Sequence, residues 1–86
     1  MNKELIELTK QQKIKQQERL LNKIAKEYKE LLVTSDKTED ELKQFLRKND
    51  AFVDGIKYGF GNIRIRELAD IFTFFNKEIV IKFIDI

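Results

Sequence analysis

The stretch Ala51–Ile86, AFVDGIKYGFGNIRIRELADIFTFFNKEIVIKFIDI, decides the fold that the sequence predicts. It reads as the end of a short helix, a glycine-rich turn, an amphipathic helix and one β-strand. The strand, residues 78–86, is rich in β-branched and aromatic side chains, a composition that suits a pleated, half-buried surface. The rest of the chain offers few strand candidates, so the simplest partner is the same strand in a second copy. We therefore expect a homodimer sealed by a two-stranded C-terminal sheet.

The expected dimer interface is the apolar set of this strand and the residue that leads into it. Its members are Phe75, Ile79, Val80, Ile81, Phe83, Ile84 and Ile86.

Composition excludes several classes of protein. The 86 residues predict one small domain with an extension. The chain contains no cysteine and no histidine, which removes disulfides, thiolate metal sites and the commonest general base. We expect no enzyme activity, no cofactor, no bound metal and no small-molecule substrate. No apolar run approaches the roughly 18 residues of a membrane span, and no secretory signal opens the chain, so a cytoplasmic protein is expected without membrane contact.

The pattern predicts a mainly α fold, a helix-turn-helix bundle of about five helices with a long N-terminal helix. Residues 1–19 are expected to form a helical extension, residues 20–76 the domain, and residues 77–86 the dimerisation strand. Residues 1–33 carry eight basic and five acidic side chains, a mild positive bias that permits contact with nucleic acid.

The middle of the chain predicts two short helices joined by a tight turn. Thr38 followed by Glu41 is a capping-box signature for a helix that ends near Lys48. Asn49 is a favoured N-cap for a second helix that reaches Tyr58. Two glycines in residues 59–62 predict backbone with positive φ before the next helix, whose expected core face is Ile65, Leu68, Ala69 and Phe72. Residues 62–66 alternate apolar and basic side chains and have an alternative interpretation as a strand.

The spacing of these helices resembles the Xre-type helix-turn-helix family, which includes phage Cro and repressor domains, plasmid repressors and several antitoxins. The matching positions are Thr38, Glu41, Leu42, Leu46, Phe52, Val53, Ile56, Gly59, Asn62, Leu68, Ala69 and Ile71. The resemblance covers residues 38–84, including the hydrophobic ending, and implies that residues 49–58 enter a major groove. The chain departs from the family where Arg47 replaces a usual glycine, and where acidic Asp50 and Asp54 replace small polar residues.

Basic residues flank the predicted helix pair, and in such dimers these positions meet phosphates while the start of the second helix reads bases. A simpler interpretation is that they are ordinary solvated charges. The candidate DNA-binding set is Arg47, Lys48, Asn49, Asp50, Ala51, Asp54, Lys57, Asn62, Arg64 and Arg66.

Two functions are therefore open. The first is a sequence-specific DNA-binding transcription regulator of a mobile element, such as a phage or plasmid repressor or an antitoxin, which binds a palindromic operator of double-stranded DNA as a dimer. The second is a protein-binding module on the same scaffold, a toxin neutraliser or phage-encoded inhibitor, whose acidic helix does not read DNA. A third interpretation, a structural assembly protein built on the N-terminal helix, is also open.

Overall fold

The computed structural model describes the backbone of residues 3–85 and the side chains of residues 9–85. It contains four helices over this range: α1 (Lys3–Thr34), α2 (Glu39–Leu46), α3 (Asp50–Tyr58) and α4 (Ile65–Phe74). The predicted mainly α class is confirmed. The long N-terminal helix is present as α1, and the prediction of about five helices is wrong, because the described residues form four.

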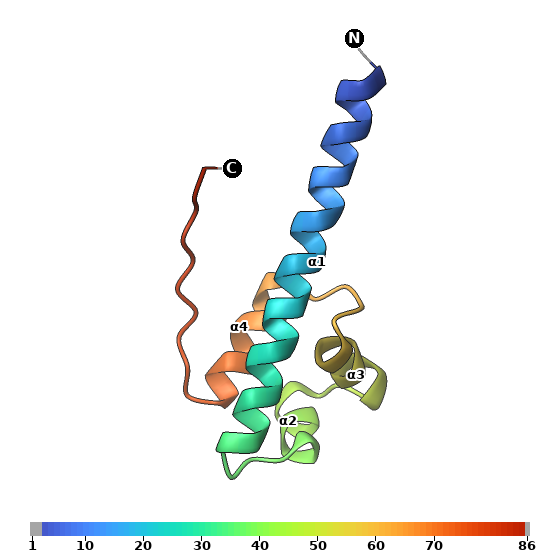
Figure 1. The fold of residues 1–86 in the computed structure, drawn as a ribbon. Helices are drawn as coiled ribbons and strands as arrows, with labels where there is room; N and C mark the ends of the chain where they lie inside the picture. The colour runs from blue at the N-terminus through green and yellow to red at the C-terminus, as the bar shows by residue number, and fades with distance from the viewer. Residues whose placement is uncertain (1–2, 86) are drawn as a thin grey trace.

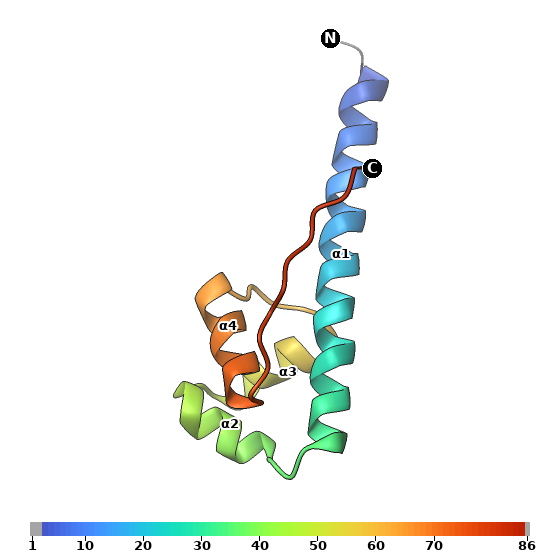
Figure 2. The same cartoon turned by 90° about the vertical axis from the view of Figure 1, so that its left-hand side faces the viewer.

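Helix α1 is the longest element, and the three short helices lie against one side of its C-terminal half (Figures 1 and 2). Helix α1 packs against α3, and α2 packs against both α3 and α4. The N-terminal half of α1 projects beyond this body (Figure 2), and every side chain from residue 9 to residue 20 is exposed. The longest dimension of the protein is consequently 52 Å, against 26 and 21 Å in the other directions.

The hydrophobic core draws residues from all four helices. Tyr28 and Leu42 are fully buried, and they are joined by the residues Ile24, Val53, Ile56, Ile71 and Phe75. The rings of Tyr28 and Phe75 meet edge to face with centroids 6.1 Å apart. The Tyr28 hydroxyl has no hydrogen-bond partner among the described residues, and burial, followed by the charge of Glu39, raises the pKa of this phenol.

Helix α4 turns part of its predicted face to the core, because Leu68 and Phe72 are half-buried against it. Ile71 is buried and Phe72 is half-buried, whereas Ile65 is 84% exposed and Ala69 is also exposed. Apolar residues are so frequent in residues 63–75 that two helical faces satisfy the same spacing, and the contact with α2 selects the one that continues to Phe75.

The predicted C-terminal strand is not present in the described residues. Residues 77–85 leave the body as an extended segment that joins no sheet (Figure 1). Asn76, with a left-handed φ of 58°, ends α4 and turns the chain into this segment. A strand is defined by backbone pairing, and no other part of the described chain forms a ladder with this segment. The Lys77 N–H bonds to the Phe72 carbonyl at 2.8 Å, which closes the end of α4 and forms no ladder. The alternative strand at residues 62–66 is also absent, because α4 begins at Ile65.

Candidate functional site

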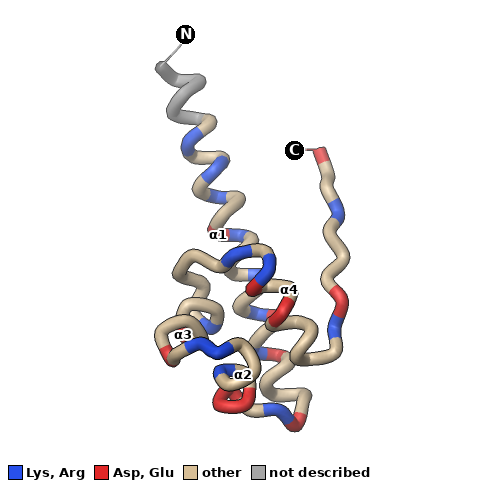
Figure 3. Tube along the Cα trace, turned by 180° about the vertical axis from the view of Figure 1, so that it is seen from behind, with Lys and Arg blue, Asp and Glu red and all other residues tan. Residues whose placement is uncertain are grey.

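The candidate site is the helix pair α2–α3, whose first helix is capped by its own side chains. The Thr38 hydroxyl accepts a hydrogen bond from the Glu41 backbone N–H at 3.2 Å, and the Thr38 backbone N–H donates to Glu41 Oε1 at 3.3 Å. Three acidic residues occupy the first turn of α2, where the helix dipole favours negative charge (Figure 3). This arrangement is the capping box that the sequence predicted.

The turn between the two helices is only three residues long, Arg47–Asn49. Arg47 adopts a left-handed conformation, with φ 55° and ψ 46°, and its N–H bonds back to the Lys43 and Gln44 carbonyls. Asn49 then begins α3, because its side-chain oxygen accepts a hydrogen bond from the Phe52 N–H at 3.1 Å. Local hydrogen bonds therefore set the end of α2 and the start of α3.

Helix α3 buries one face and exposes the other. Val53 and Ile56 enter the core, while Asp50, Ala51 and Asp54 are exposed. At 100° per residue, the exposed residues lie along one outward stripe of the helix. These are three of the predicted DNA-binding residues, and no part of the described chain covers them.

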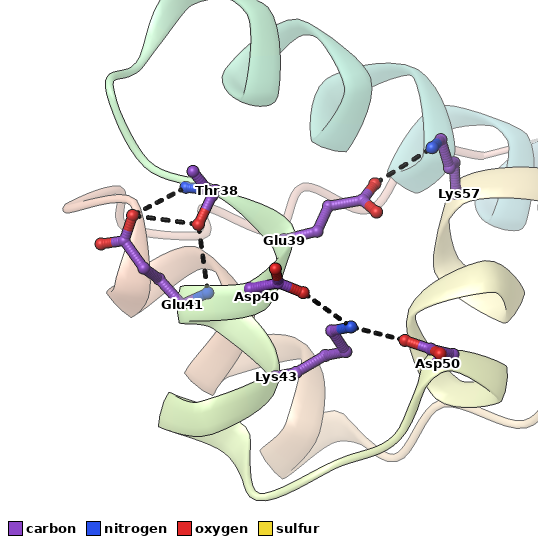
Figure 4. Close-up of polar contacts among 7 residues, drawn as sticks. All are labelled: Thr38, Glu39, Asp40, Glu41, Lys43, Asp50 and Lys57. Atoms are coloured by element: carbon purple, nitrogen blue, oxygen red, sulfur yellow. Dashed lines mark hydrogen bonds and ion pairs between the residues drawn. The ribbon is translucent and has the colours of Figure 1, made fainter.

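The negative charge at the start of α3 is partly balanced within the protein. Lys43 of α2 reaches across the turn and places its Nζ 2.8 Å from Asp40 and 2.5 Å from Asp50 (Figure 4). These hydrogen bonds raise the pKa of Lys43 and lower the pKa of Asp40. Asp54, one turn further along α3, is in no ion pair among the described residues. The outward stripe consequently carries one carboxylate in an ion pair, Asp50, and one outside any ion pair among the described residues, Asp54.

Two of the predicted phosphate-binding lysines are tied to acidic side chains. Lys48 Nζ lies 2.8 Å from Glu67 Oε2 of α4, and Lys57 Nζ lies 3.1 Å from Glu39 Oε1 of α2. The second pair raises the pKa of Lys57, chiefly through the hydrogen bond to Glu39. The first pair joins the turn to α4 and the second joins α3 to α2, so these lysines stabilise the fold and are less available to a phosphate than their sequence positions suggest.

The guanidinium groups are the basic groups near the helix pair that stay unpaired. Arg47, Arg64 and Arg66 are exposed, and none joins an ion pair in the described part of the chain. Arg64 is the N-cap of α4, and its backbone N–H donates to Glu67 Oε1 at 2.9 Å. The predicted contact residue Asn62 is exposed in the loop before α4.

The loop after α3 is held close to the body by glycines. Gly59 and Gly61 have φ of 73° and 101°, as predicted for this turn. The exposed rings of Tyr58 and Phe60 lie parallel there, with centroids 6.3 Å apart, and the Lys29 ammonium lies 5.9 Å from the Tyr58 centroid. An aromatic patch therefore flanks the end of α3.

The predicted dimer residues occupy two different environments. Phe75 is 6% exposed and belongs to the core of its own chain. Ile79, Val80, Ile81, Phe83 and Ile84 are exposed on the extended segment, and Ile86 lies outside the described residues.

Sequence reasoning missed the acidic and basic partners that organise the site. Lys43, Glu39 and Glu67 were not predicted to pair with Asp50, Lys57 and Lys48. The available signal was opposite charge at positions that face each other across a tight turn, as for Lys43 and Asp50, which are seven residues apart.

No family model, curated protein or solved structure matches the chain. Within the described residues there is no group of three or more carboxylates placed to hold a metal ion. None of the helices in the described range has the length and apolar character that crossing a membrane requires.

Proposed function

We propose that the protein is a sequence-specific DNA-binding regulator that inserts α3 into the major groove of a palindromic operator. The observation that carries this proposal is the outward stripe of α3, which is exposed and lies at the N-terminal end of the helix, where Asn49 forms the N-cap. A recognition helix needs this combination, because its N-terminal residues must reach base edges while the preceding helix crosses the backbone.

The charges around α3 are compatible with this role. Lys43 pairs with Asp50 as well as with Asp40, so the repulsion between Asp50 and a nearby phosphate is reduced. Asp54 keeps a free carboxylate, a group that accepts a hydrogen bond from the amino group of cytosine. Arg47, Arg64 and Arg66 remain free for phosphates, which fix the register of a bound protein without reading sequence.

The proposed regulator acts as a homodimer joined by residues 77–85, since a two-fold protein matches a two-fold DNA site. Its half-sites would lie about 34–36 Å apart or a multiple of that distance. The resemblance to phage and plasmid repressors and antitoxins supports a cytoplasmic regulator of a mobile element.

A random duplex library tests the proposal directly. The purified protein is incubated with the library at moderate salt, and the retained sequences are read after several rounds. We expect an inverted repeat to be enriched, because two α3 helices related by a two-fold axis read the same bases on opposite strands. The substitution A51E, on the exposed stripe of α3, should abolish enrichment.

The matched control is A69E, which adds the same charge at an exposed position of α4 outside the stripe. It should enrich the same repeat as the unaltered protein. Retention without a motif that disappears with added salt would contradict sequence-specific binding, because that behaviour is purely electrostatic.

A second candidate function, recognition of a basic protein surface, rests on one observation. The free carboxylate of Asp54 and the exposed aromatic ring of Tyr58 share the outward side of α3, and aromatic residues are enriched at protein interfaces. Failure of the library experiment with a folded dimer would favour this candidate, with a toxin as the kind of partner.

A further inference from the structure

Residues 77–85, here called the C-terminal segment, expose an unusual amount of apolar surface. Ile79 is 37% exposed, Val80 84%, Ile81 68%, Phe83 91% and Ile84 76%. The segment is extended and runs away from the end of α4 (Figures 1 and 2). In extended backbone, successive side chains point to opposite sides, so Ile79, Ile81 and Phe83 share one side. Unpaired backbone beside apolar side chains is a template for strand addition.

The charges of the segment identify its partner and the alignment. Its charged residues are, in order, Lys77, Glu78, Lys82 and Asp85. The segment therefore begins with a basic residue and ends with an acidic one. We propose that the C-terminal segment pairs antiparallel with the same segment of a second copy, with Ile81 opposite the partner's Ile81. This inference defines the interface of the dimer in the proposed function. It rests on the proposed function only for what the dimer does.

In this alignment, a residue that lies a given number of positions before Ile81 faces the partner residue that lies the same number of positions after Ile81. Lys77 faces the partner's Asp85, and Ile79 faces the partner's Phe83. Glu78 lies diagonally beside the partner's Lys82, at a distance that long side chains span. One side of the ribbon is therefore a continuous apolar stripe closed at both ends by opposite charges, and all four charged residues have a partner.

The neighbouring alignments are worse for definite reasons. A shift of one residue in one direction places Glu78 opposite the partner's Asp85, and like charges directly opposite each other destabilise a strand pair. A shift in the other direction places Asp85 opposite the partner's Asn76, whose left-handed φ of 58° does not fit a strand. Centring the pair on Lys82 places two ammonium groups face to face. Centring it on Val80 would pair Asp85 with the partner's Phe75, which is buried in the core beyond the left-handed Asn76. Only the alignment centred on Ile81 uses the full segment without a charge conflict.

Single cysteine variants test the alignment, because the chain contains no cysteine of its own. The variants are V80C, I81C and K82C, each oxidised under mild conditions without DNA and followed on non-reducing gels. Directly opposite residues have Cα atoms about 4.5–5.5 Å apart, within the range that a disulfide spans. We expect I81C to form a covalent dimer at least about tenfold faster than the other two, whose equivalent atoms are about 7–8 Å apart.

Charge exchange provides an independent readout by analytical ultracentrifugation. K77D and D85K should each dissociate the dimer, because each creates two like-charge pairs. An equimolar mixture should restore dimers, because both end pairs are then of opposite charge. K26D, at an exposed position of α1, is the matched control and should stay dimeric.

Faster cross-linking of V80C or K82C would overturn the proposed alignment. An unaltered protein that is monomeric in the ultracentrifuge, with no variant cross-linking, would overturn the pairing itself. These measurements use no DNA, so a dimer that cross-links through I81C and enriches no operator would sink the regulator and leave the interface intact.

Discussion

At the scale of single residues, two backbone positions show how the helix pair is shaped. Gly55 weakens α3 by its intrinsic propensity, and the structure explains its presence, since a Cβ atom there would lie 2.8 Å from the Phe60 carbonyl oxygen. The loop after α3 can therefore approach the helix, and Phe60 N–H bonds to the Gly55 carbonyl at 3.0 Å. Arg47 is the opposite case, because a side chain occupies a left-handed position that favours glycine.

The substitution R47G should stabilise the protein. A non-glycine residue in the left-handed region is strained by roughly 1–2 kcal/mol, partly offset by the greater freedom of glycine in the unfolded chain. We expect the free energy of unfolding in urea to rise by about 0.5–1 kcal/mol. R66G, which makes the same change inside α4, should lower it by about 1 kcal/mol. A loss of stability in R47G would mean that its side chain makes a contact stronger than the backbone strain.

At the scale of elements, ion pairs hold the short helices against one another. Lys43 joins α2 to α3, Lys57 joins α3 to α2, and Lys48 joins the turn to α4. Lys37, in the loop before α2, donates to the Phe74 carbonyl at the end of α4, where the helix dipole favours a cation. Short helices are marginal alone, so these contacts and the shared core make them persist.

Glu67 makes one of these contacts dependent on pH. The hydrogen bond from Lys48, then that from the Arg64 backbone N–H, lowers the pKa of Glu67. A carboxyl whose pKa is depressed by folding stabilises the protein above the ordinary glutamate pKa of about 4.3, and this stabilisation is lost as pH falls through the folded-state pKa.

E67Q should therefore be less stable than the unaltered protein at pH 7, by less than about 1 kcal/mol because the pair is partly solvated. The difference should shrink as the pH is lowered from about 5 to 3. Urea unfolding at several pH values measures it, and E27Q, at an exposed site with no ion pair in the described part of the chain, is the control. A difference that persists unchanged at pH 3 would show that the carboxylate charge is not the cause.

At the scale of the whole molecule, the chain has a compact end and a projecting end. The core is formed by residues between Ile24 and Phe75. Helix α1 continues beyond the core, and all its side chains from residue 9 to residue 20 are exposed. Net charge is only +2, and the internal ion pairs remove Lys43, Lys48 and Lys57 from the pool of free cations near α3. In the proposed complex, attraction of DNA to α3 would therefore rest on the unpaired arginines.

The double substitution R64A/R66A should weaken DNA binding equally for all sequences. Each lost phosphate contact reduces the slope of log affinity against log salt by about 0.9. Fluorescence anisotropy with the selected operator and with a scrambled duplex, at several salt concentrations, measures both effects. K10A/K13A removes the same charge from the exposed N-terminal half of α1 and should leave the slope nearer its original value. An unchanged slope in R64A/R66A would exclude these arginines from the interface.

The amino-acid sequence by itself determined the features that arise from local hydrogen bonds. Thr38 with Glu41 and Asn49 mark helix starts, and Gly59 marks the end of α3, because each cap bonds to backbone within a few residues. These signals placed α3 at residues 50–58, where the structure has it. They also defined the exposed stripe as a candidate for binding.

Only the tertiary structure decided which face of α4 is buried and which charged residues form ion pairs. It rotated α4 so that Ile71 and Phe75 are buried, and it paired Lys43 with Asp50, because both outcomes depend on helices that approach from distant parts of the sequence. It also left residues 77–85 extended and without a strand partner. A strand's hydrogen bonds come from another segment, so its sequence alone specifies the capacity to pair and not the partner.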